Sequence, residues 1–426
     1  MLTKDEIRQV LAEQQDEVRS YDHSKFIERD QLSVAHRHLN KNWIKVITGI
    51  RRCGKSVLAR QMLQNESFSY INFDDERLIG LQTKDLNSLL QYLLELNPDT
   101  KILFFDEIQN VDGWELFANR LQRQGYNLVI TGSNSKLLSK ELATHLTGRY
   151  IPIPLSPFSF REFLKSRKIS VQTDDILKTD KRALLIKLLN EFASTGGFPE
   201  MVVTGFYPAY LRELYDKIIS RDINQRYSIK YGKTLKELAL YSFSNLSNRM
   251  TYNKVKNIFD INSVHTIKNY FQYLEDAYLL TLLKPFSYKV KEQVRNPRKI
   301  YTVDNGLSRA ISPKFTSDQG AALENLVFQE LTRRQLDCTY FLDSDFEVDF
   351  VIKSGQEVSE LIQACYSLEN LETKAREIKA LVRASKHTKC KNLKIITWDE
   401  QGTDKIDGTI IQIEPIWKWL TLRDQS

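Results

Sequence analysis

Three short apolar runs stand in the first third of the chain, and each ends in small or polar residues. They are, in chain order, Trp43–Thr48, Ile102–Phe105 and Asn127–Ile130. Apolar runs of this length are typical of parallel strands that are buried on both faces. The first run is followed by Val57–Leu63, which continues as a helix. These patterns predict an open α/β sheet whose polar residues gather at the carboxyl edge, where ligands bind in such sheets.

Between the first strand and its helix lies the motif G-x-x-x-x-G-K-S, formed by Gly49, Gly54, Lys55 and Ser56. Glycines let successive backbone N–H groups curl around a phosphate, the lysine reaches the β and γ oxygens, and the hydroxyl ligates magnesium. The N-terminus of the helix completes the anion site. The motif predicts a site for a nucleoside triphosphate and Mg²⁺, formed by Gly49, Ile50, Arg51, Arg52, Cys53, Gly54, Lys55, Ser56 and Val57.

The second apolar run ends in Asp106 and Glu107. In a P-loop ATPase, an acid at the end of such a strand holds magnesium through water, and a neighbouring glutamate polarises the attacking water. We therefore expect Ser56 and Asp106 to hold the metal, Glu107 to position water and Lys55 to offset phosphate charge. Without the neighbouring motif, a solvated acidic turn would be the better interpretation of this pair.

The third apolar run ends in the sequence Thr131-Gly132-Ser133-Asn134. Because the carboxyl ends of parallel strands meet at one edge of a sheet, these polar side chains are expected near the phosphates. We interpret Ser133 and Asn134 as sensors of the γ-phosphate.

From Thr234 to Tyr301 the expected order is helix, turn, helix, turn, longer helix and then two strands around a basic loop. This order is typical of a winged helix-turn-helix. Apolar residues recur at three- and four-residue spacing within Ser263–Leu280, which predicts an amphipathic helix that exposes His265, Lys268 and Asn269. Such a helix can lie in a major groove.

The loop beside this helix carries a basic cluster, made of Lys289, Lys291, Arg295, Arg298 and Lys299. In a DNA-binding winged helix these residues would neutralise phosphates of duplex DNA. The alternative is that the module serves only for packing between domains or for contacts in an oligomer.

The last segment of the chain, from Gly320, has its own order of a helix followed by strands. A helix over Ala321–Leu336 contains Glu324, and a strand over Glu347–Ile352 contains Asp349. This order resembles the core of restriction-endonuclease-like nucleases, which use such a pair, together with an E-x-K pair on the next strand, to hold magnesium and activate water.

The E-x-K positions are occupied by Gln363 and Cys365 in this chain. A glutamine is neutral and a cysteine cannot replace the lysine cation, so we expect an inactive nuclease-like fold that binds DNA or a protein partner. Glu357 or Glu360 as a substitute ligand is the alternative, and it would retain cleavage.

Length and composition favour a folded chain of several domains over a secreted, membrane-spanning or disulfide-rich protein. A chain of 426 residues is expected to form two or three domains, and its 42% hydrophobic and 27% charged residues predict a folded chain. The N-terminal segment lacks the apolar region of a signal peptide, and the apolar runs are too short to cross a bilayer. Four scattered cysteines without a C-x-x-C pair favour a reducing cytoplasm over zinc or disulfides. A net charge of +7 permits binding to nucleic acid without requiring it.

Beyond these motifs, the chain resembles the bacterial and archaeal AAA-type ATPases that carry a C-terminal domain of unknown function with a nuclease-like fold. The resemblance covers most of the chain. It rests further on the segments Tyr70–Leu78, Leu146–Tyr150 with the PLSPFSFREFL that follows, Thr195–Glu200 and Ile219–Ile223. It implies an ATPase related to the STAND-like and origin-recognition clades, with a lid over the nucleotide.

The resemblance also implies a role for Arg149, which matches an arginine that contacts a γ-phosphate in its own subunit or in a neighbouring one. Such an arginine stabilises the charge that develops on the transferred phosphoryl group. Without the resemblance, an arginine at this place would be interpreted as part of a surface ion pair.

Together these expectations give an α/β protein with four parts. Residues 1–155 would form the AAA-type P-loop ATPase core, 156–232 a helical lid, 233–312 the winged helix-turn-helix and 313–426 the restriction-endonuclease-like domain. The expected function is a slow ATP- and Mg²⁺-dependent switch in the cytoplasm, without membrane contact, that binds duplex DNA or a protein partner. A DNA-acting ATPase with a functional metal-dependent nuclease site is the alternative. Self-assembly into a homo-oligomer and the choice of ATP over GTP stay open.

Overall fold

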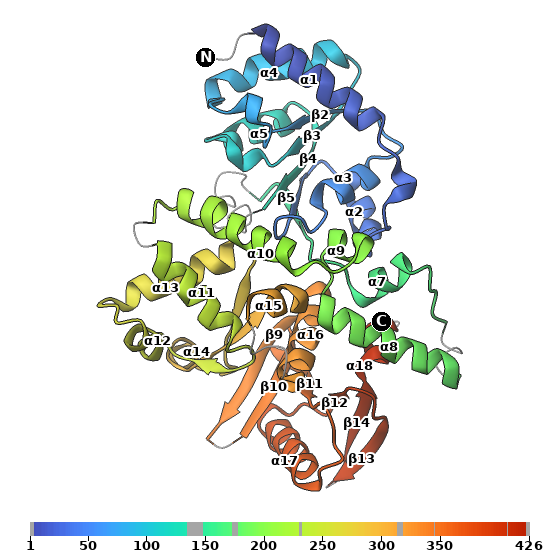
Figure 1. Ribbon diagram of the computed structural model, residues 1–426, viewed down its shortest axis with the longest axis vertical. Coiled ribbons are helices and arrows are strands. Elements are labelled where there is room, and N and C mark those ends of the chain that lie inside the picture. The colour runs from blue at the N-terminus through green and yellow to red at the C-terminus, as the bar shows by residue number, and fades with distance from the viewer. Residues whose placement is uncertain are drawn as a thin grey trace. The chain divides into compact units, whose positions relative to one another are not determined.

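The computed structural model describes residues 4–133, 148–172, 178–229, 232–312, 318–344, 346–406 and 408–422. The chain divides into two compact units, Met1–Ser156 and Pro157–Ser426 (Figure 1). Among the described residues, no helix is both long and apolar enough to cross a membrane. Asn134 and the first two residues of the motif Leu146–Tyr150 lie outside the described residues.

The first unit contains a five-stranded parallel sheet with the order β2-β3-β4-β1-β5. Its strands are β1 (Ile44–Thr48), β2 (Phe68–Asn72), β3 (Ile102–Asp106), β4 (Asn127–Gly132) and β5 (Tyr150–Pro154). The expected α/β class with a parallel sheet is therefore confirmed. The strand of the G-x-x-x-x-G-K-S motif, β1, is separated from the acidic strand β3 by β4, so all three predicted polar strand ends share one edge.

Helices cover this sheet on both faces (Figure 1). They are α1 (Lys4–Arg19), α2 (Leu32–Leu39), α3 (Lys55–Met62), α4 (Leu86–Leu96) and α5 (Trp114–Arg123). One apolar cluster joins α1, α4 and α5 to alternate strand residues, such as Val46 and Ile130. The intervening residues Ile47 and Val129 are also buried, on the face that α3 contacts. Burial of both faces explains why these strands read as continuous apolar runs.

The second unit begins with helices and then forms a small sheet. The helices are α7 (Phe160–Ser166), α8 (Thr179–Thr195), α9 (Pro199–Thr204) and α10 (Pro208–Lys217), followed by a π-helix at Ile218–Gln225. The next elements are α11 (Gly232–Phe243), β6 (Arg249–Met250), α12 (Tyr252–Ile258), α13 (Val264–Asp276), β7 (Leu280–Leu283), α14 (Val290–Arg295) and β8 (Arg298–Thr302). The three strands form an antiparallel sheet with the order β6-β8-β7. The basic loop thus contains a short helix, which the sequence did not predict.

The rest of the second unit is built on a six-stranded mixed sheet with the order β13-β14-β12-β11-β10-β9. Its elements are α15 (Asn305–Ile311), α16 (Gln319–Arg333), β9 (Asp337–Asp343), β10 (Phe346–Ser354), β11 (Glu357–Ala364), α17 (Leu371–Thr388), β12 (Leu393–Thr397), β13 (Gly402–Ile406), β14 (Thr409–Pro415) and α18 (Ile416–Thr421). Helix α17 packs on the sheet in one apolar cluster. Helix α16 contributes Phe328, which stacks on Tyr301 of β8 at a ring distance of 4.2 Å.

Candidate functional site

The loop between β1 and α3 has the backbone that the G-x-x-x-x-G-K-S motif predicts. A Cβ atom on Gly49 would lie 2.0 Å from the carbonyl oxygen of Leu155, so only glycine fits there. Gly54 caps α3 with a φ of +97°, a left-handed conformation that favours glycine. Arg29, which the sequence reasoning missed, fixes the loop from outside, since its guanidinium donates to the carbonyl of Cys53 at 2.6 Å. The loop is therefore a preformed cradle for an anion at a helix N-terminus.

Lys55 and Glu107 form an ion pair inside this cradle. Lys55 Nζ lies 3.3 Å from Glu107 Oε1, and the two side chains are 4% and 15% exposed. Burial opposes both charges, but the attraction between them prevails, so the pKa of Lys55 is raised and that of Glu107 is lowered. Glu107 also has a φ of +52°, an unfavourable conformation for a side chain of this size. The pair is therefore charged and held at some cost in backbone strain.

Ser56 and Asp106 lie together next to this pair. Ser56 Oγ donates a hydrogen bond of 2.9 Å to Asp106 Oδ1. Burial and the neighbouring Glu107 raise the pKa of Asp106. A hydroxyl and a carboxylate are oxygen ligands of the kind that Mg²⁺ takes alongside phosphates and water. The residues present therefore fit the magnesium ion that the sequence predicts.

Two side chains that the sequence did not single out hold Asp106 in place. Thr131, at the end of β4, donates to Asp106 and accepts a hydrogen bond of 3.0 Å from the backbone N–H of Glu107. Tyr70, on β2, donates to the other carboxylate oxygen of Asp106 at 3.2 Å. Because β4 pairs with β3, Thr131 holds both residues of the acidic motif, Asp106 and Glu107. Only the strand order reveals this role.

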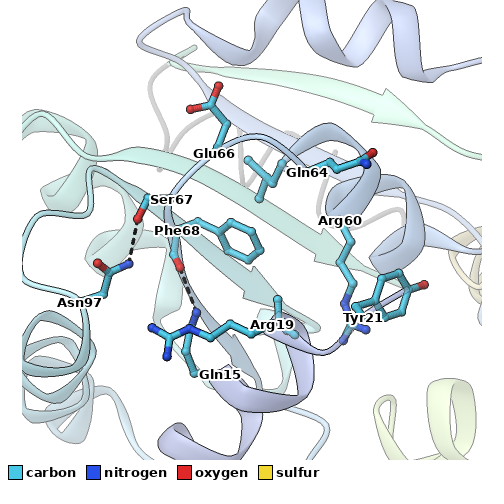
Figure 2. A pocket seen from close by; sticks show the side chains of 11 residues that line it. Gln15, Arg19, Tyr21, Arg60, Gln64, Glu66, Ser67, Phe68 and Asn97 are labelled. Atoms are coloured by element: carbon cyan, nitrogen blue, oxygen red, sulfur yellow. Dashed lines mark hydrogen bonds between the residues drawn. The ribbon is translucent and has the colours of Figure 1, made fainter. Parts of the chain in front are cut away.

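Behind Tyr70, a cavity of about 360 Å³ opens among the ends of α1 and α3 and the start of β2 (Figure 2). Arg60 lines it, stacks over Tyr21 at 4.5 Å from the ring centroid, and donates to the Tyr70 hydroxyl at 3.3 Å. Residues of the phosphate loop do not line this cavity. It is therefore separate from the predicted phosphate site, although Arg60 and Tyr70 connect it to Asp106.

The remaining predicted phosphate-site residues differ in their placement. Ser133 is buried near the edge, and its hydroxyl has no hydrogen-bond partner among the described residues. Arg51 is paired with Asp74 at 3.3 Å. Ile50 and Cys53 are buried in the loop, Arg52 has a left-handed φ of +67°, and Val57 is half-buried in α3.

Arg149 lies at the other edge of the sheet. It precedes β5, whose first residue, Tyr150, is paired with Ile44 at the beginning of β1. The phosphate loop follows the last residue of β1, roughly 13 Å along the strand. The strand pairing therefore places Arg149 at the beginning of β1, at the end opposite to the phosphate loop.

Comparison with known proteins agrees with this geometry. A family model described as an AAA domain matches residues 41–164, and one described as a domain of unknown function (DUF8612) matches residues 186–318. An uncharacterized protein of Methanocaldococcus jannaschii, MJ1544, is 42% identical over 398 residues, which are 89% of this chain and 88% of that protein. The chain belongs to this AAA-domain family. An uncharacterized protein of Haemophilus influenzae is 33% identical over 74% of this chain and 81% of its own length.

Solved structures resemble the AAA-domain protein less closely. The Walker-type ATPase PABY2304 of Pyrococcus abyssi shares 14% identity at a TM-score of 0.43, covering 68% of this chain and 96% of that one. The RuvB branch migration motor of Thermotoga maritima shares 13% identity at a TM-score of 0.30, covering 62% and 92%. The family match shows a P-loop ATPase domain of the AAA type.

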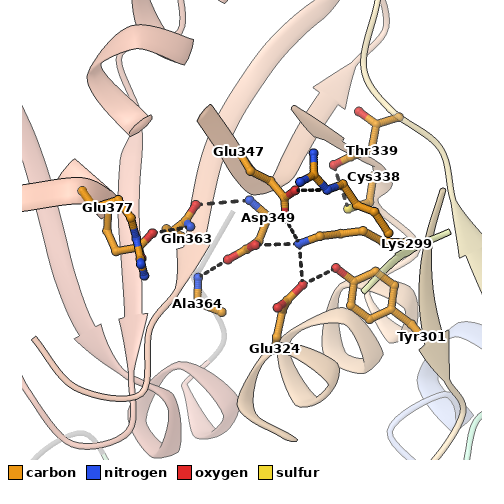
Figure 3. Close-up of polar contacts among 12 residues, drawn as sticks. Lys299, Tyr301, Glu324, Cys338, Thr339, Glu347, Asp349, Gln363, Ala364 and Glu377 are labelled. Carbon is orange, nitrogen blue, oxygen red and sulfur yellow. Dashed lines mark hydrogen bonds and ion pairs between the residues drawn. The ribbon is translucent and has the colours of Figure 1, made fainter. Parts of the chain in front are cut away.

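The second unit of this AAA-domain protein contains a separate cluster of charged side chains (Figure 3). Lys299 of β8 lies at its centre, 2.8 Å from Glu324, 2.6 Å from Glu347 and 2.8 Å from Asp349. Tyr301 donates to Glu324 at 2.6 Å. The predicted pair Glu324 and Asp349 is thus brought together. Lys299, predicted as an exposed basic residue of the wing, is only 2% exposed in its side chain, so this prediction was wrong.

The charge of this cluster is set by the burial of its members. Although burial opposes it, Asp349, Glu324 and Glu347 hold the pKa of Lys299 well above its ordinary range. Burial and the nearby Asp349 raise the pKa of Glu324 to about 7. Glu347 is further paired with Arg249 of β6 at 3.2 Å.

The E-x-K positions contribute no cation to the cluster. Gln363 accepts a hydrogen bond from the backbone of Asp349 and donates to Glu377 of α17 at 2.5 Å. Cys365 packs in the apolar cluster under α17, and its thiol donates to the carbonyl of Ser367. The proposed substitutes do not join either, because Glu360 is paired with Lys394 at 3.2 Å and Glu357 is exposed at the start of β11.

Proposed function

We propose that this protein is an ATP-hydrolysing switch of the AAA type, coupled to a winged-helix and nuclease-like region that contacts DNA or a protein. The observation that carries the proposal is the convergence of Lys55, Ser56, Asp106 and Glu107 at one edge of the parallel sheet. A phosphate cradle, a lysine, a metal-binding pair and a second carboxylate are the parts that phosphoryl transfer to water requires.

Each side chain has a role in this proposal. The loop Gly49–Ser56 binds the phosphates, and Ser56 and Asp106 hold Mg²⁺, which neutralises charge on the phosphate oxygens when bound. Thr131 and Tyr70 keep the carboxylate of Asp106 in one orientation. Glu107 accepts the proton of a water molecule that attacks the γ-phosphate.

The ion pair between Lys55 and Glu107 supplies the switch. A phosphate that binds in the loop competes with Glu107 for the Lys55 ammonium, because both offer anionic oxygens to the same donor. Loss of the ammonium leaves Glu107 free to turn toward water. Binding therefore changes the conformation by as much as its differential affinity for the two arrangements allows.

The second unit supplies the output in this proposal. Its order of helices with the sheet β6-β8-β7 is compatible with a winged helix, and the order of α16 with β9–β12 is compatible with a nuclease-like core. His265, Lys268, Lys289, Lys291 and Arg295 are exposed, as contact with phosphates requires. The amide and thiol at the E-x-K positions, and the lysine among the acids, favour binding over cleavage.

The test is steady-state ATP hydrolysis by the full chain and by Glu107→Gln, with and without duplex DNA, at low and moderate salt. Phosphate release that depends on Glu107 supports the proposal, and equal rates for both proteins contradict it. Stimulation by DNA that fades with salt places phosphate contacts in the cycle. A rate indifferent to DNA points instead to a protein partner.

Arg149 acts in a neighbouring copy of the chain in this proposal. What supports it is the position of Arg149 at the edge away from its own phosphate loop. Arg149→Ala and Lys55→Met are each expected to hydrolyse ATP poorly, while a mixture of the two recovers part of the activity, because one subunit retains the loop and the other the arginine. A mixture no more active than its components would contradict action between subunits.

A further inference from the structure

The buried ammonium of Lys299 has an unusual number of acidic partners. An ammonium group has three N–H donors, and Lys299 lies within 2.6 to 2.8 Å of carboxylate oxygens of Glu324, Glu347 and Asp349. The three acids come from α16 and β10, whereas the lysine comes from β8 of the small sheet. The lysine therefore comes from a different element than the acids, and its three N–H donors all face carboxylate oxygens (Figure 3).

This arrangement has the form of a hard-cation site. Three convergent carboxylate oxygens around one centre are what Mg²⁺, Mn²⁺ or Ca²⁺ takes, at distances of about 2.0 to 2.6 Å. A divalent ion placed among the same oxygens would overlap the ammonium and be repelled by its charge. One positive group can occupy the site at a time.

The other hydrogen bonds made to these acids also differ from those of an open metal site. Tyr301 donates its hydroxyl to the same oxygen of Glu324 that Lys299 contacts, and the backbone N–H of Ala364 donates to the other carboxylate oxygen of Asp349 at 3.0 Å. Gln363 faces Glu377 and the backbone of Asp349. As the side chains stand, no group of three or more His, Cys, Asp or Glu among the described residues could hold a metal ion.

We propose that Lys299 is a tethered cation that occupies the carboxylate site of the second unit in place of a divalent metal ion. The site holds its acids together without metal, fastens β8 to α16 and β10, and takes a hard divalent cation only when the ammonium is removed. The proposal does not depend on ATP hydrolysis, and hydrolysis by the variants below is measured separately, so that failure of one proposal is distinguishable from failure of the other.

The experiment compares the full chain with Lys299→Met, free of nucleotide, in EDTA and in millimolar Mn²⁺ or Ca²⁺. In EDTA the unfolding temperature of the second unit is expected to fall by about 10 °C, because the carboxylates of Glu324 and Asp349 lose the ammonium that neutralises them in a buried site. The divalent ion is expected to restore much of this loss in Lys299→Met and to leave the wild type unchanged. Restoration should disappear in Lys299→Met/Asp349→Asn, which lacks one of the metal ligands.

The matched control is Lys353→Met. Lys353 is a lysine of β10 with a single carboxylate partner, Asp337, at 2.6 Å, and its side chain is 27% exposed. This variant is expected to show a small loss of stability and no response to the divalent ion. An equal response in both variants would indicate binding elsewhere and overturn the proposal.

Two other results would overturn it. A wild type that gains stability from Mn²⁺, or cleaves DNA with it, and loses this property in Asp349→Asn has an open metal site. A variant Lys299→Met that ignores the ion has no latent one. If Lys299→Met does not fold in EDTA, the yield of refolding with and without Mn²⁺ provides the same comparison, and failure under both conditions counts against the proposal.

Discussion

Lys55 in the first unit and Lys299 in the second are both buried lysines paired with carboxylates, but their surroundings suit them to different roles. Each ammonium is almost fully buried and lies against carboxylates. Lys55 has one carboxylate partner, at 3.3 Å, next to a loop of glycines and N–H groups. Lys299 has three, at 2.6 to 2.8 Å, and no such loop.

The two lysines differ in whether their ammonium group can still bind a ligand. Lys55 has one weak ion pair and a carbonyl contact with Ile50, so a phosphate replaces its partners with better ones. Lys299 has all three donors engaged with anions, and any ligand would have to displace several buried ion pairs. A lysine among acids is therefore a ligand-binding group when it is under-coordinated and a structural cation when it is saturated.

The largest expected effect concerns the partner of Lys55. Glu107→Gln is expected to lower the rate of ATP hydrolysis by about 10³-fold, because an amide cannot accept the proton of the attacking water. The same change frees Lys55, so ATP should bind as well as in the wild type or a few-fold more tightly. Single-turnover hydrolysis and equilibrium ATP binding measure the two effects.

Glu76→Gln is the control for this variant, since Glu76 is an exposed carboxylate of the same unit. It should leave the rate and the affinity unchanged. Weaker ATP binding by Glu107→Gln would mean that the ion pair does not compete with phosphate.

The second effect separates the two lysines directly. Lys55→Met is expected to weaken ATP binding by about 100-fold, because charge-assisted hydrogen bonds to phosphate are worth about 1.5 to 3 kcal/mol. Lys299→Met should leave ATP affinity within about twofold while lowering thermal stability. Titration with a fluorescent ATP analogue and thermal unfolding of both variants give the comparison, which fails if both variants lose the same property.

The sequence alone predicted most of the phosphate site in the first unit and little of the Lys299 cluster in the second. Lys55 and Ser56 were predictable because they complete the G-x-x-x-x-G-K-S motif that follows an apolar strand. Asp106 and Glu107 were predictable because they stand at the end of another apolar strand, and parallel strand ends converge. Thr131 was expected at the same edge, but its contacts with Asp106 and Glu107 were not, because they depend on β4 lying next to β3, which no strand pattern in the chain specifies. Asn134, predicted as a sensor, lies outside the described residues.

Lys299 was misjudged for a different reason. It was counted with four neighbouring basic residues, although its contacts lie 25 and 50 residues away, on Glu324 and Asp349. One signal was available, since Lys299 and Tyr301 alternate along a strand and must share a face. A lysine that shares a face with a tyrosine in the apolar strand β8 indicates burial more than exposure.

The third prediction concerns the threonine that holds Asp106 and Glu107 in the first site. Thr131→Val removes a hydroxyl that donates to Asp106 and accepts from the N–H of Glu107. The loss of these contacts is expected to cost about 1 to 2 kcal/mol, or roughly tenfold in the Mg²⁺ dependence of ATP hydrolysis. Thr48→Val is the matched control, because the buried hydroxyl of Thr48 has no hydrogen-bond partner among the described residues. Equal behaviour of the two variants would contradict the role of Thr131.

The smallest effect tests a third buried lysine that has neither phosphate loop nor acids. Lys45 on β1 is fully buried, and its ammonium donates to the carbonyl of Lys41 and the amide oxygen of Asn127. Burial lowers the pKa of Lys45 to about 8. The unfolded value is about 10.4, so between these two values the unfolded chain binds more protons than the folded one.

The free energy of unfolding should therefore increase as the pH rises above about 8, with a contribution from Lys45 of about 1 kcal/mol over the first pH unit. Urea denaturation of the wild type and Lys45→Met across this range measures the difference, and the variant should lack this part of the pH dependence. Parallel pH profiles would show that Lys45 stays protonated in the folded chain. That result would extend the comparison, because carbonyl and amide oxygens alone would then be enough to keep a buried ammonium charged. The three acids around Lys299 would then serve a purpose other than keeping its ammonium charged.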